Sequence, residues 1–156
     1  MTTAPPIDGL DDLPGHHIRR LQQIAVGIFM DETAELNVTP VQFALLFAAW
    51  KESGLDQRTL AGRIGLDTST IGAVIDRLEI RELIERRVSP DDKRVRLLNV
   101  TAAGKKLLQG VMPAMLRAQD RILAPLPKAD RTKFMSMVRR IVDENNAWSR
   151  AAKDSG

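Results

Sequence analysis

Five basic residues lie close together between residues 86 and 96, in a stretch that also carries turn-forming residues. They are Arg86, Arg87, Lys93, Arg94 and Arg96, interspersed with Glu85, Asp91 and Asp92. Arginines on a narrow protrusion suit the electronegative minor groove of DNA. Asp92, two residues before Arg94, is expected to orient that arginine. The alternative is a solvated charged hairpin, which is usual for such a stretch taken alone.

Three hydroxyl residues, Thr68, Ser69 and Thr70, stand at the expected start of a helix. Hydroxyls and backbone amides at a helix N-terminus can contact phosphates and base edges. Ala73 and Arg77 lie further along the same helix, and we count both among the candidate DNA contacts. The alternative is that the three hydroxyl residues serve only as the cap and first turn of the helix.

A third candidate site lies near the N-terminus, in residues 15–20 (Gly-His-His-Ile-Arg-Arg). On a helical wheel His17 falls within an apolar stripe and Arg20 lies at its edge, whereas His16 and Arg19 point elsewhere. An imidazole and a guanidinium beside an apolar wall could hold a small aromatic carboxylate or phenol. We therefore take His16, His17 and Arg20 as candidate ligand residues. The alternative is a partly buried interface histidine with solvated arginines.

The remaining composition argues against other kinds of site. The chain has no cysteine, so disulfides, thiolate metal sites and cysteine nucleophiles are excluded. Adjacent histidines on a helix diverge by about 100° and cannot chelate one ion, so no metal or other cofactor is predicted. An enzyme on a helical scaffold finds no support, because there is no glycine-rich phosphate loop and no Ser/His/Asp pattern.

Length and charge further limit the class of protein to which the chain can belong. The 156 residues, 44% of them hydrophobic, suit one compact domain with additional helices. The net charge of +3 separates into −4 for residues 1–38, +1 for residues 39–98 and +6 for residues 99–156. The start of the chain is acidic and rich in proline, and no window reaches the ~18 apolar residues of a membrane span. We expect a cytoplasmic protein without a membrane partner.

These residues must be positioned by helices and one hairpin. Thr39, Asp56 and Thr101 are expected N-caps, and Gly65 is expected to turn between two helices. Apolar periodicity and turn chemistry place the following elements. They are helices over about 14–36, 40–52, 57–64, 68–80, 102–123 and 128–148, and a hairpin of 83–88 with 95–100.

A short helix, a glycine turn, a second helix and a basic hairpin follow one another in the order of a winged helix-turn-helix. Ala61 is small where two helices cross, and Gly65 follows four residues later. The predicted fold is therefore mainly α with a small β-hairpin wing. Apolar stripes on the first helix and on residues 111–123 would be costly to expose, which predicts that N- and C-terminal helices bury them in a dimer.

Motifs from about Leu36 to Leu108 match one known family. They are residues 36–43 (Leu-Asn-Val-Thr-Pro-Val-Gln-Phe), 60–61 (Leu-Ala), 64–67 (Ile-Gly-Leu-Asp), the helix 68–79, 83–87 (Leu-Ile-Glu-Arg-Arg), 90–94 (Pro-Asp-Asp-Lys-Arg) and 98–104 (Leu-Asn-Val-Thr-Ala-Ala-Gly). On these residues the chain resembles the MarR family of transcriptional regulators. Gly72 and Ala73 stand where the family usually has hydroxyl or larger polar residues, and Glu82 replaces a usual glycine.

The resemblance implies a homodimer on a pseudopalindromic double-stranded DNA operator, with repression relieved by a small ligand. It implies a flexible arm (1–12), an N-terminal dimerisation and ligand-pocket helix (13–37), a winged DNA-binding domain (38–100) and C-terminal dimerisation helices (101–156). Residues 15–23 also resemble regulators of aromatic-acid catabolism, including repressors that respond to hydroxynicotinate. The alternative function is a winged-helix module for protein–protein assembly without DNA binding.

Overall fold

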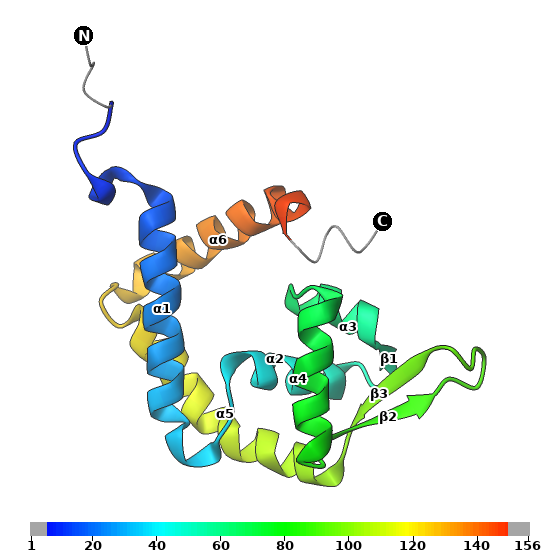
Figure 1. Ribbon diagram of the computed structural model, residues 1–156. Coiled ribbons are helices and arrows are strands. Elements are labelled where there is room, and N and C mark those ends of the chain that lie inside the picture. The colour runs from blue at the N-terminus through cyan, green and yellow to red at the C-terminus, as the bar shows by residue number, and fades with distance from the viewer. Residues whose placement is uncertain (1–5, 150–156) are drawn as a thin grey trace.

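The computed structural model describes residues 6–149, which form six α-helices and a three-stranded antiparallel sheet (Figure 1). The helices are α1 (Pro14–Glu32), α2 (Pro40–Lys51), α3 (Gln57–Ile64), α4 (Thr68–Ile80), α5 (Ala102–Leu123) and α6 (Lys128–Glu144). The strands are β1 (Leu55–Asp56), β2 (Ile84–Val88) and β3 (Arg96–Val100). This architecture confirms the predicted fold class, a mainly helical protein with a small wing.

Local capping explains where most helices begin. Thr39 and Gln42 form a reciprocal capping box at α2, with bonds of 3.2 and 3.1 Å. Asp56 accepts the Thr59 amide at 2.9 Å at the start of α3. Thr101 accepts the Gly104 amide at 3.0 Å at the start of α5. Each of these caps satisfies a backbone donor that the helix itself leaves unpaired, as the sequence predicted.

The turns depend on left-handed backbone conformations. Gly65 ends α3 with φ of +70°, a conformation that glycine adopts without a steric penalty. Glu82 follows α4 with φ of +56°, at the position where the family usually has glycine. The Leu83 amide there donates to the Leu78 carbonyl at 2.9 Å and closes the helix. A side chain at this φ is disfavoured, so Glu82 carries backbone strain.

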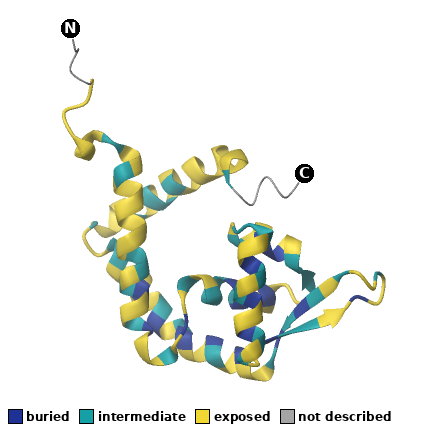
Figure 2. Ribbon diagram, viewed as in Figure 1, coloured by how far each residue is buried: buried dark blue, intermediate teal, exposed yellow. Residues whose placement is uncertain are grey.

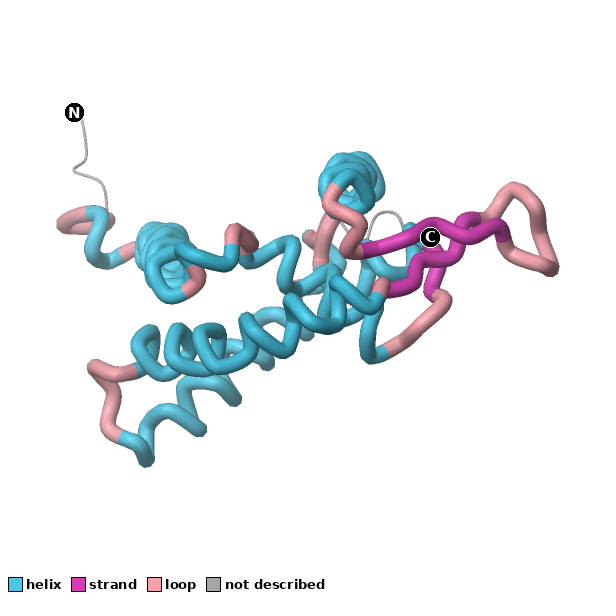
Figure 3. Tube along the Cα trace, turned by 90° about the horizontal axis from the view of Figure 1, so that it is seen from below, coloured by secondary structure: helices cyan, strands magenta, loops and turns pink. Residues whose placement is uncertain are grey.

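Strand β3 lies at the centre of the sheet, between β1 and β2. Leu98 pairs with Arg86 on one side and with Leu55 on the other. The sequence predicted the β2–β3 hairpin and missed β1, whose two residues are too short for any alternating pattern. The wing loop between β2 and β3 projects from one end of the molecule, and the connection between α5 and α6 lies at the other end (Figure 3).

The main hydrophobic core lies inside the winged domain, where the buried colours of Figure 2 concentrate. Its largest fully buried side chains are Leu45, Leu46, Leu60, Ile71, Ile75, Leu78, Ile84 and Leu98. Gly104 closes this core from α5, because a Cβ there would lie 2.1 Å from the Leu83 carbonyl oxygen. Only glycine allows α5 to pass this close to the backbone before β2.

A second, smaller core joins α1 to α5 through Phe29, Val38, Val111 and Ala118. Ion pairs reinforce the contact, since Arg121 lies 2.6 Å from Asp31 and 2.8 Å from Glu32. The C-terminal half of α1 and part of the α5 stripe are therefore covered within one chain. This corrects, for Val111 alone, the expectation that the α5 stripe is left for a second copy, because Leu116 in the same stripe remains 59% exposed.

Two helices end earlier than the sequence predicted. The first ends at Glu32, where the amide and the buried hydroxyl of Thr33 both donate to the Phe29 carbonyl, and a 3-10 turn over Ala34–Leu36 follows. The last helix ends at Glu144 and continues as a 3-10 turn, Asn146–Trp148. Residues Leu10–Asp12 of the expected flexible arm also form a 3-10 turn, whereas residues 1–5 of that arm and residues 150–156 of the C-terminal segment lie outside the described residues.

Candidate nucleic-acid interface and ligand cleft

Helix α4 begins with a carboxylate that gathers the neighbouring hydroxyls. Asp67 accepts the Thr70 amide at 2.7 Å, the Ser69 hydroxyl at 2.6 Å and the Thr70 hydroxyl at 2.9 Å. These hydrogen bonds, with that of Ser69 the largest cause, lower the pKa of Asp67 to about 2. The hydroxyls of Ser69 and Thr70 therefore serve the helix cap. Both residues are also exposed, so they remain accessible from solvent.

One face of α4 is exposed along its length. Thr70, Ala73 and Arg77 are spaced by three and four residues, which places them on the same side of the helix. All three are exposed, and the opposite face buries Ile71, Ile75 and Leu78 in the core. The candidate contact residues of α4 thus share a surface that no other element of the described chain buries.

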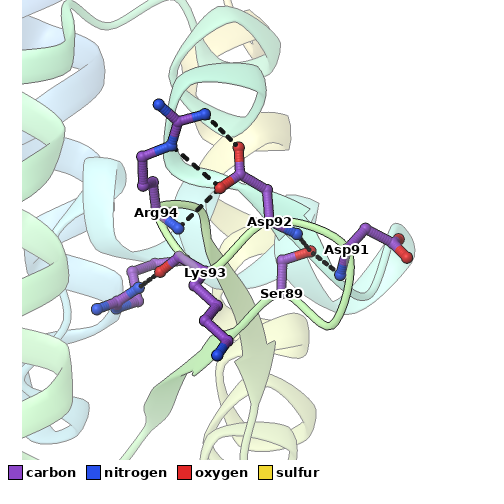
Figure 4. Close-up of polar contacts among 6 residues, drawn as sticks. Ser89, Asp91, Asp92, Lys93 and Arg94 are labelled. Atoms are coloured by element: carbon purple, nitrogen blue, oxygen red, sulfur yellow. Dashed lines mark hydrogen bonds and ion pairs between the residues drawn. The ribbon is translucent and has the colours of Figure 1, made fainter.

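The wing loop holds Arg94 at its tip (Figure 4). The Arg94 backbone amide donates to Asp92 Oδ1 at 2.9 Å, and its Nε donates to the same oxygen at 3.3 Å. The backbone bond and then the side-chain bond lower the pKa of Asp92. The Arg94 side chain is 91% exposed. A second guanidinium nitrogen, Nη2, donates to Asp92 Oδ2 at 3.5 Å. Asp92 therefore holds both the backbone and one edge of the guanidinium, while the side chain stays exposed to solvent.

The base of the wing loop is organised by one buried hydroxyl. Ser89 is 8% exposed, and its Oγ accepts the amides of Asp91 and Asp92 at 3.2 and 3.4 Å (Figure 4). Arg96 donates to the Lys93 carbonyl at 2.8 Å, which braces the other side of the loop. Ser89 belongs to the predicted turn but was not among the predicted site residues, although serine in a turn is a common hydrogen-bonding position.

Arg86 faces inward, unlike the other candidate arginines of the wing. Its guanidinium pairs with Glu79 and, at 2.6 Å, with Asp76, both on α4, and its side chain is only 23% exposed. Because side chains alternate along a strand, Arg86 on β2 turns toward α4 while Arg87 points to solvent. We expected Arg86 to contact DNA, whereas the structure uses its charge to join the wing to α4.

The candidate ligand residues near the N-terminus separate into two groups. His17 and Arg20 line a cleft of about 600 Å³ between α1 and α6. His16 lies outside this lining, and its Nδ1 is 3.4 Å from the Arg19 guanidinium. Partial desolvation, followed by the charge of Arg19, lowers the pKa of His16. The structure brings together two of the three predicted residues and directs the third elsewhere.

Apolar side chains of α6 form the opposite wall of this cleft. They are Phe134, Met137, Val138 and Ile141, which face Ile18, Leu21 and Ile24 of α1. His17 also contacts the Asp11 carbonyl, 2.9 Å from its Nε2. These α6 residues were not among the predicted ligand residues, although their spacing of three and four residues is the pattern of an amphipathic helix.

No helix in the described range 6–149 is long and apolar enough to cross a membrane.

Comparisons with known proteins place the winged domain in a family. A sequence model of the MarR family matches residues 38–95. The PcaV transcriptional regulator of Streptomyces coelicolor, solved in complex with its natural ligand, is 34% identical. Its structure superposes with a TM-score of 0.80 over 89% of this chain and 98% of PcaV.

Two further structures are similar over the same range. The transcriptional repressor CouR, bound to a 23-mer DNA duplex, is 28% identical, with a TM-score of 0.82 over 90% of this chain and 99% of CouR. Bordetella bronchiseptica BpsR, whose DNA binding is regulated by 6-hydroxynicotinic acid, is 25% identical, with a TM-score of 0.84 over 89% of this chain and 99% of BpsR. Together with the exposed α4 face and the arginine-tipped wing, these likenesses show that the chain belongs to the MarR family of DNA-binding transcriptional regulators and is not an enzyme.

Proposed function

We propose that this protein is a homodimeric repressor that binds a pseudopalindromic DNA duplex and releases it when a small aromatic acid binds. The observation that carries the proposal is Arg94, held by Asp92 at the tip of a wing that Arg86 joins to α4. A wing and an exposed helix face that move as one unit can contact adjacent grooves of one half-site. CouR, which resembles this chain, is a repressor solved on a DNA duplex.

The expected contacts to DNA fall into two groups, those of α4 and those of the wing. Thr68, Ser69, Thr70 and Ala73 lie where α4 would enter a major groove, and Arg77 would contact phosphate. Arg94, with Lys93 and Arg96 behind it, would enter the minor groove, where shape and electronegativity attract arginine. Because Ala73 offers only a methyl group, base recognition would depend more on groove shape than on hydrogen bonds.

A second copy of the chain would cover α6. None of the residues of α6, all of which the structure describes, is buried, and Met137, Ile141 and Val142 are between 52% and 58% exposed. The N-terminal half of α1 exposes Ile18 and Ile24 to a similar degree. Burying such faces between two copies removes apolar surface from water and sets two winged domains side by side.

The effector would bind at the polar edge of this same face, beside the area that a second copy would cover. His17 and Arg20 supply a polar edge to an otherwise apolar cleft, which suits a planar ring with a carboxylate. BpsR, whose DNA binding responds to 6-hydroxynicotinic acid, has a closely similar fold. His16 lies outside the cleft and would not contact this ligand.

Fluorescence anisotropy with labelled duplexes from the DNA upstream of the protein's own gene tests the repressor. Arg94→Ala should weaken binding at least about tenfold at constant salt, because one buried guanidinium contact is lost. Arg139→Ala removes the same charge from the solvent face of α6 and should leave the affinity unchanged. Equal affinities for the wild type and Arg94→Ala would refute the DNA interface, and failure to bind any duplex would favour a protein-assembly module.

A thermal-shift titration tests the effector site. 6-Hydroxynicotinate or 4-hydroxybenzoate should raise the melting temperature of the wild type, because a ligand that binds only the folded state stabilises it. Arg20→Ala should remove most of that increase, while Arg139→Ala should retain it. A melting temperature that responds equally in both variants would exclude Arg20 from the site.

A further inference from the structure

Gly72 of α4 carries no side chain, and a side chain of α3 occupies the space beside it. A Cβ on Gly72 would lie 3.2 Å from Gln57 Nε2. Gln57 is the first residue of α3, directly after the Asp56 cap. Because glycine lets a neighbouring group approach the backbone closely, the Gln57 carboxamide stands where a side chain of residue 72 would begin.

The Gln57 carboxamide borders the outer surface of α4. Ser69, Gly72 and Asp76 are spaced by three and four residues and form one row along the helix. Ser69 and Asp76 are exposed, whereas Gly72 and Gln57 are half-buried against each other. Ala73, which is also exposed, lies four residues from Ser69 and three from Asp76, beside this row. Gln57 therefore adjoins the residues of α4 that we expect in the major groove.

The polar groups of the Gln57 side chain are available to a ligand. A carboxamide offers two N–H donors and one carbonyl acceptor. Within residues 6–149 the Gln57 carboxamide forms no hydrogen bond. The neighbouring polar groups of α4 are already engaged, since the Ser69 hydroxyl donates to Asp67 at 2.6 Å. Asp76 in turn pairs with Arg86 at 2.6 Å. Gln57 thus brings an uncommitted hydrogen-bonding group to this surface.

The turn between α3 and α4 fixes this arrangement. The Leu66 amide, just after Gly65, donates to the Ala61 carbonyl at 3.0 Å and closes the turn. Ala61 of α3 and Ile71 of α4 are both buried in the core of the winged domain. Helix α3 lies beside the first half of α4 (Figure 1). Because both helices are anchored in one core, the first residue of α3 stays beside Gly72.

We propose that Gln57 determines part of the sequence specificity of DNA binding, through contact of its carboxamide with the edge of an adenine in the major groove. The inference rests on the proposed function, in which α4 enters that groove. A carboxamide fits adenine because its N–H donates to N7 while its carbonyl accepts from the N6 amino group. Gln57 would thereby add a hydrogen-bonded base contact to an interface that otherwise depends on groove shape.

Base preferences at single positions test this role of Gln57. The full-length wild type selects its site from a library of random-sequence duplexes, and each base pair of the selected site is then replaced in turn. Fluorescence anisotropy at constant salt gives the Kd of every duplex for the wild type, Gln57→Ala, Gln57→Glu and the control Gln23→Ala. Gln23 is exposed on α1 and lies outside the cleft between α1 and α6.

We expect a position of the selected site at which the wild type prefers adenine and Gln57→Ala has lost the preference, by a factor of at least about five. At the same position Gln57→Glu should prefer cytosine, because a carboxylate accepts a hydrogen bond from the N4 amino group of that base. Gln23→Ala should keep every preference of the wild type. A contact of Gln57 with phosphate alone would instead weaken binding to all duplexes equally.

Gly72→Ala tests whether the base contact depends on the close approach of Gln57 to α4. The added Cβ forces the Gln57 carboxamide to give way by a few tenths of an ångström. The variant should therefore reduce the same adenine preference. In the Gln57→Ala background the added methyl group should change that preference by less than about twofold, since no carboxamide is left to displace.

Three results would overturn the proposal. The first is a set of base preferences that Gln57→Ala and Gln57→Glu leave unchanged. The second is an equal loss of affinity for every duplex, which would assign Gln57 to a phosphate. The third is an equal effect of Gly72→Ala with and without the Gln57 side chain. A wild type that selects no duplex at all would refute the proposed function itself, so the two failures are distinguishable.

Discussion

Helices α4 and α6 carry the same apolar pattern, but its residues are buried in α4 and largely exposed in α6. In α4 the residues at spacings of three and four are Ile71, Val74, Ile75 and Leu78, and in α6 they are Phe134, Met137, Val138 and Ile141. Ile71, Ile75 and Leu78 are fully buried, whereas Met137 and Ile141 are more than half exposed. The winged domain therefore completes its hydrophobic core within one chain. The apolar face of α6 is left uncovered, so its partner surface must come from outside the chain.

The largest effect is expected where α5 closes the core of the winged domain. Gly104→Ala places a Cβ 2.1 Å from the Leu83 carbonyl oxygen, so backbone must move. We expect the free energy of unfolding to fall by about 3 kcal/mol or more in urea denaturation at constant protein concentration. Gly110→Ala, also in α5, meets nothing within 4 Å and should be neutral or stabilising. Equal free energies of unfolding for Gly104→Ala and Gly110→Ala would show that α5 need not pass so close to the Leu83 carbonyl.

The second largest effect is expected at the exposed apolar face of α6, where we expect the second copy to bind. Ile141→Glu places a charge in that face and should weaken dimerisation at least about 100-fold, because an unpaired buried charge is costly. Sedimentation velocity over a concentration series measures the change. Thr132→Glu adds the same charge to the opposite face of α6 and should leave the dimer intact. A dimeric Ile141→Glu protein would mean that α6 does not lie at the interface.

A smaller effect is expected at the junction of α4 and the wing. Arg86→Ala leaves Glu79 and Asp76 without their cation, and should lower the free energy of unfolding by about 1–2 kcal/mol. Arg87→Ala removes a side chain that is 69% exposed and paired with the exposed Glu85, so its cost should stay below about 0.5 kcal/mol. Urea denaturation of the two variants measures the difference. Similar losses in both would contradict an inward role for Arg86.

The smallest effect concerns the cap of α4. The folded-state pKa of Asp67 is about 2, below its ordinary value of 3.8, so its contribution to stability is present above pH 4 and is lost as the pH falls toward 2. Asp67→Asn keeps a capping oxygen and removes this titration. The stability advantage of the wild type should therefore shrink between pH 4 and pH 2 in thermal unfolding. Parallel pH curves would show that Asp67 does not contribute in this way.

Features that depend on neighbouring residues were predicted well from the sequence. The caps at Thr39, Asp56 and Thr101, the turn at Gly65 and the hairpin all rest on hydrogen bonds or dihedral angles within a few residues. The sequence also showed that Glu82 stands in place of a glycine. The structure gives Glu82 a positive φ, the conformation that glycine adopts most easily. The early end of α1 was not predicted, because the apolar periodicity continues to Leu36, while the chain changes to a 3-10 turn over Ala34–Leu36.

Features that depend on distant segments were decided by the tertiary structure. It turned Arg86 toward α4, separated His16 from His17, and set α6 opposite the N-terminal half of α1. The sequence by itself determined the helices, the hairpin and the family, since periodicity and capping are local. Which apolar face is buried, and which arginine is left for DNA, depends on what surface reaches it from elsewhere in the chain, and no local pattern contains that information.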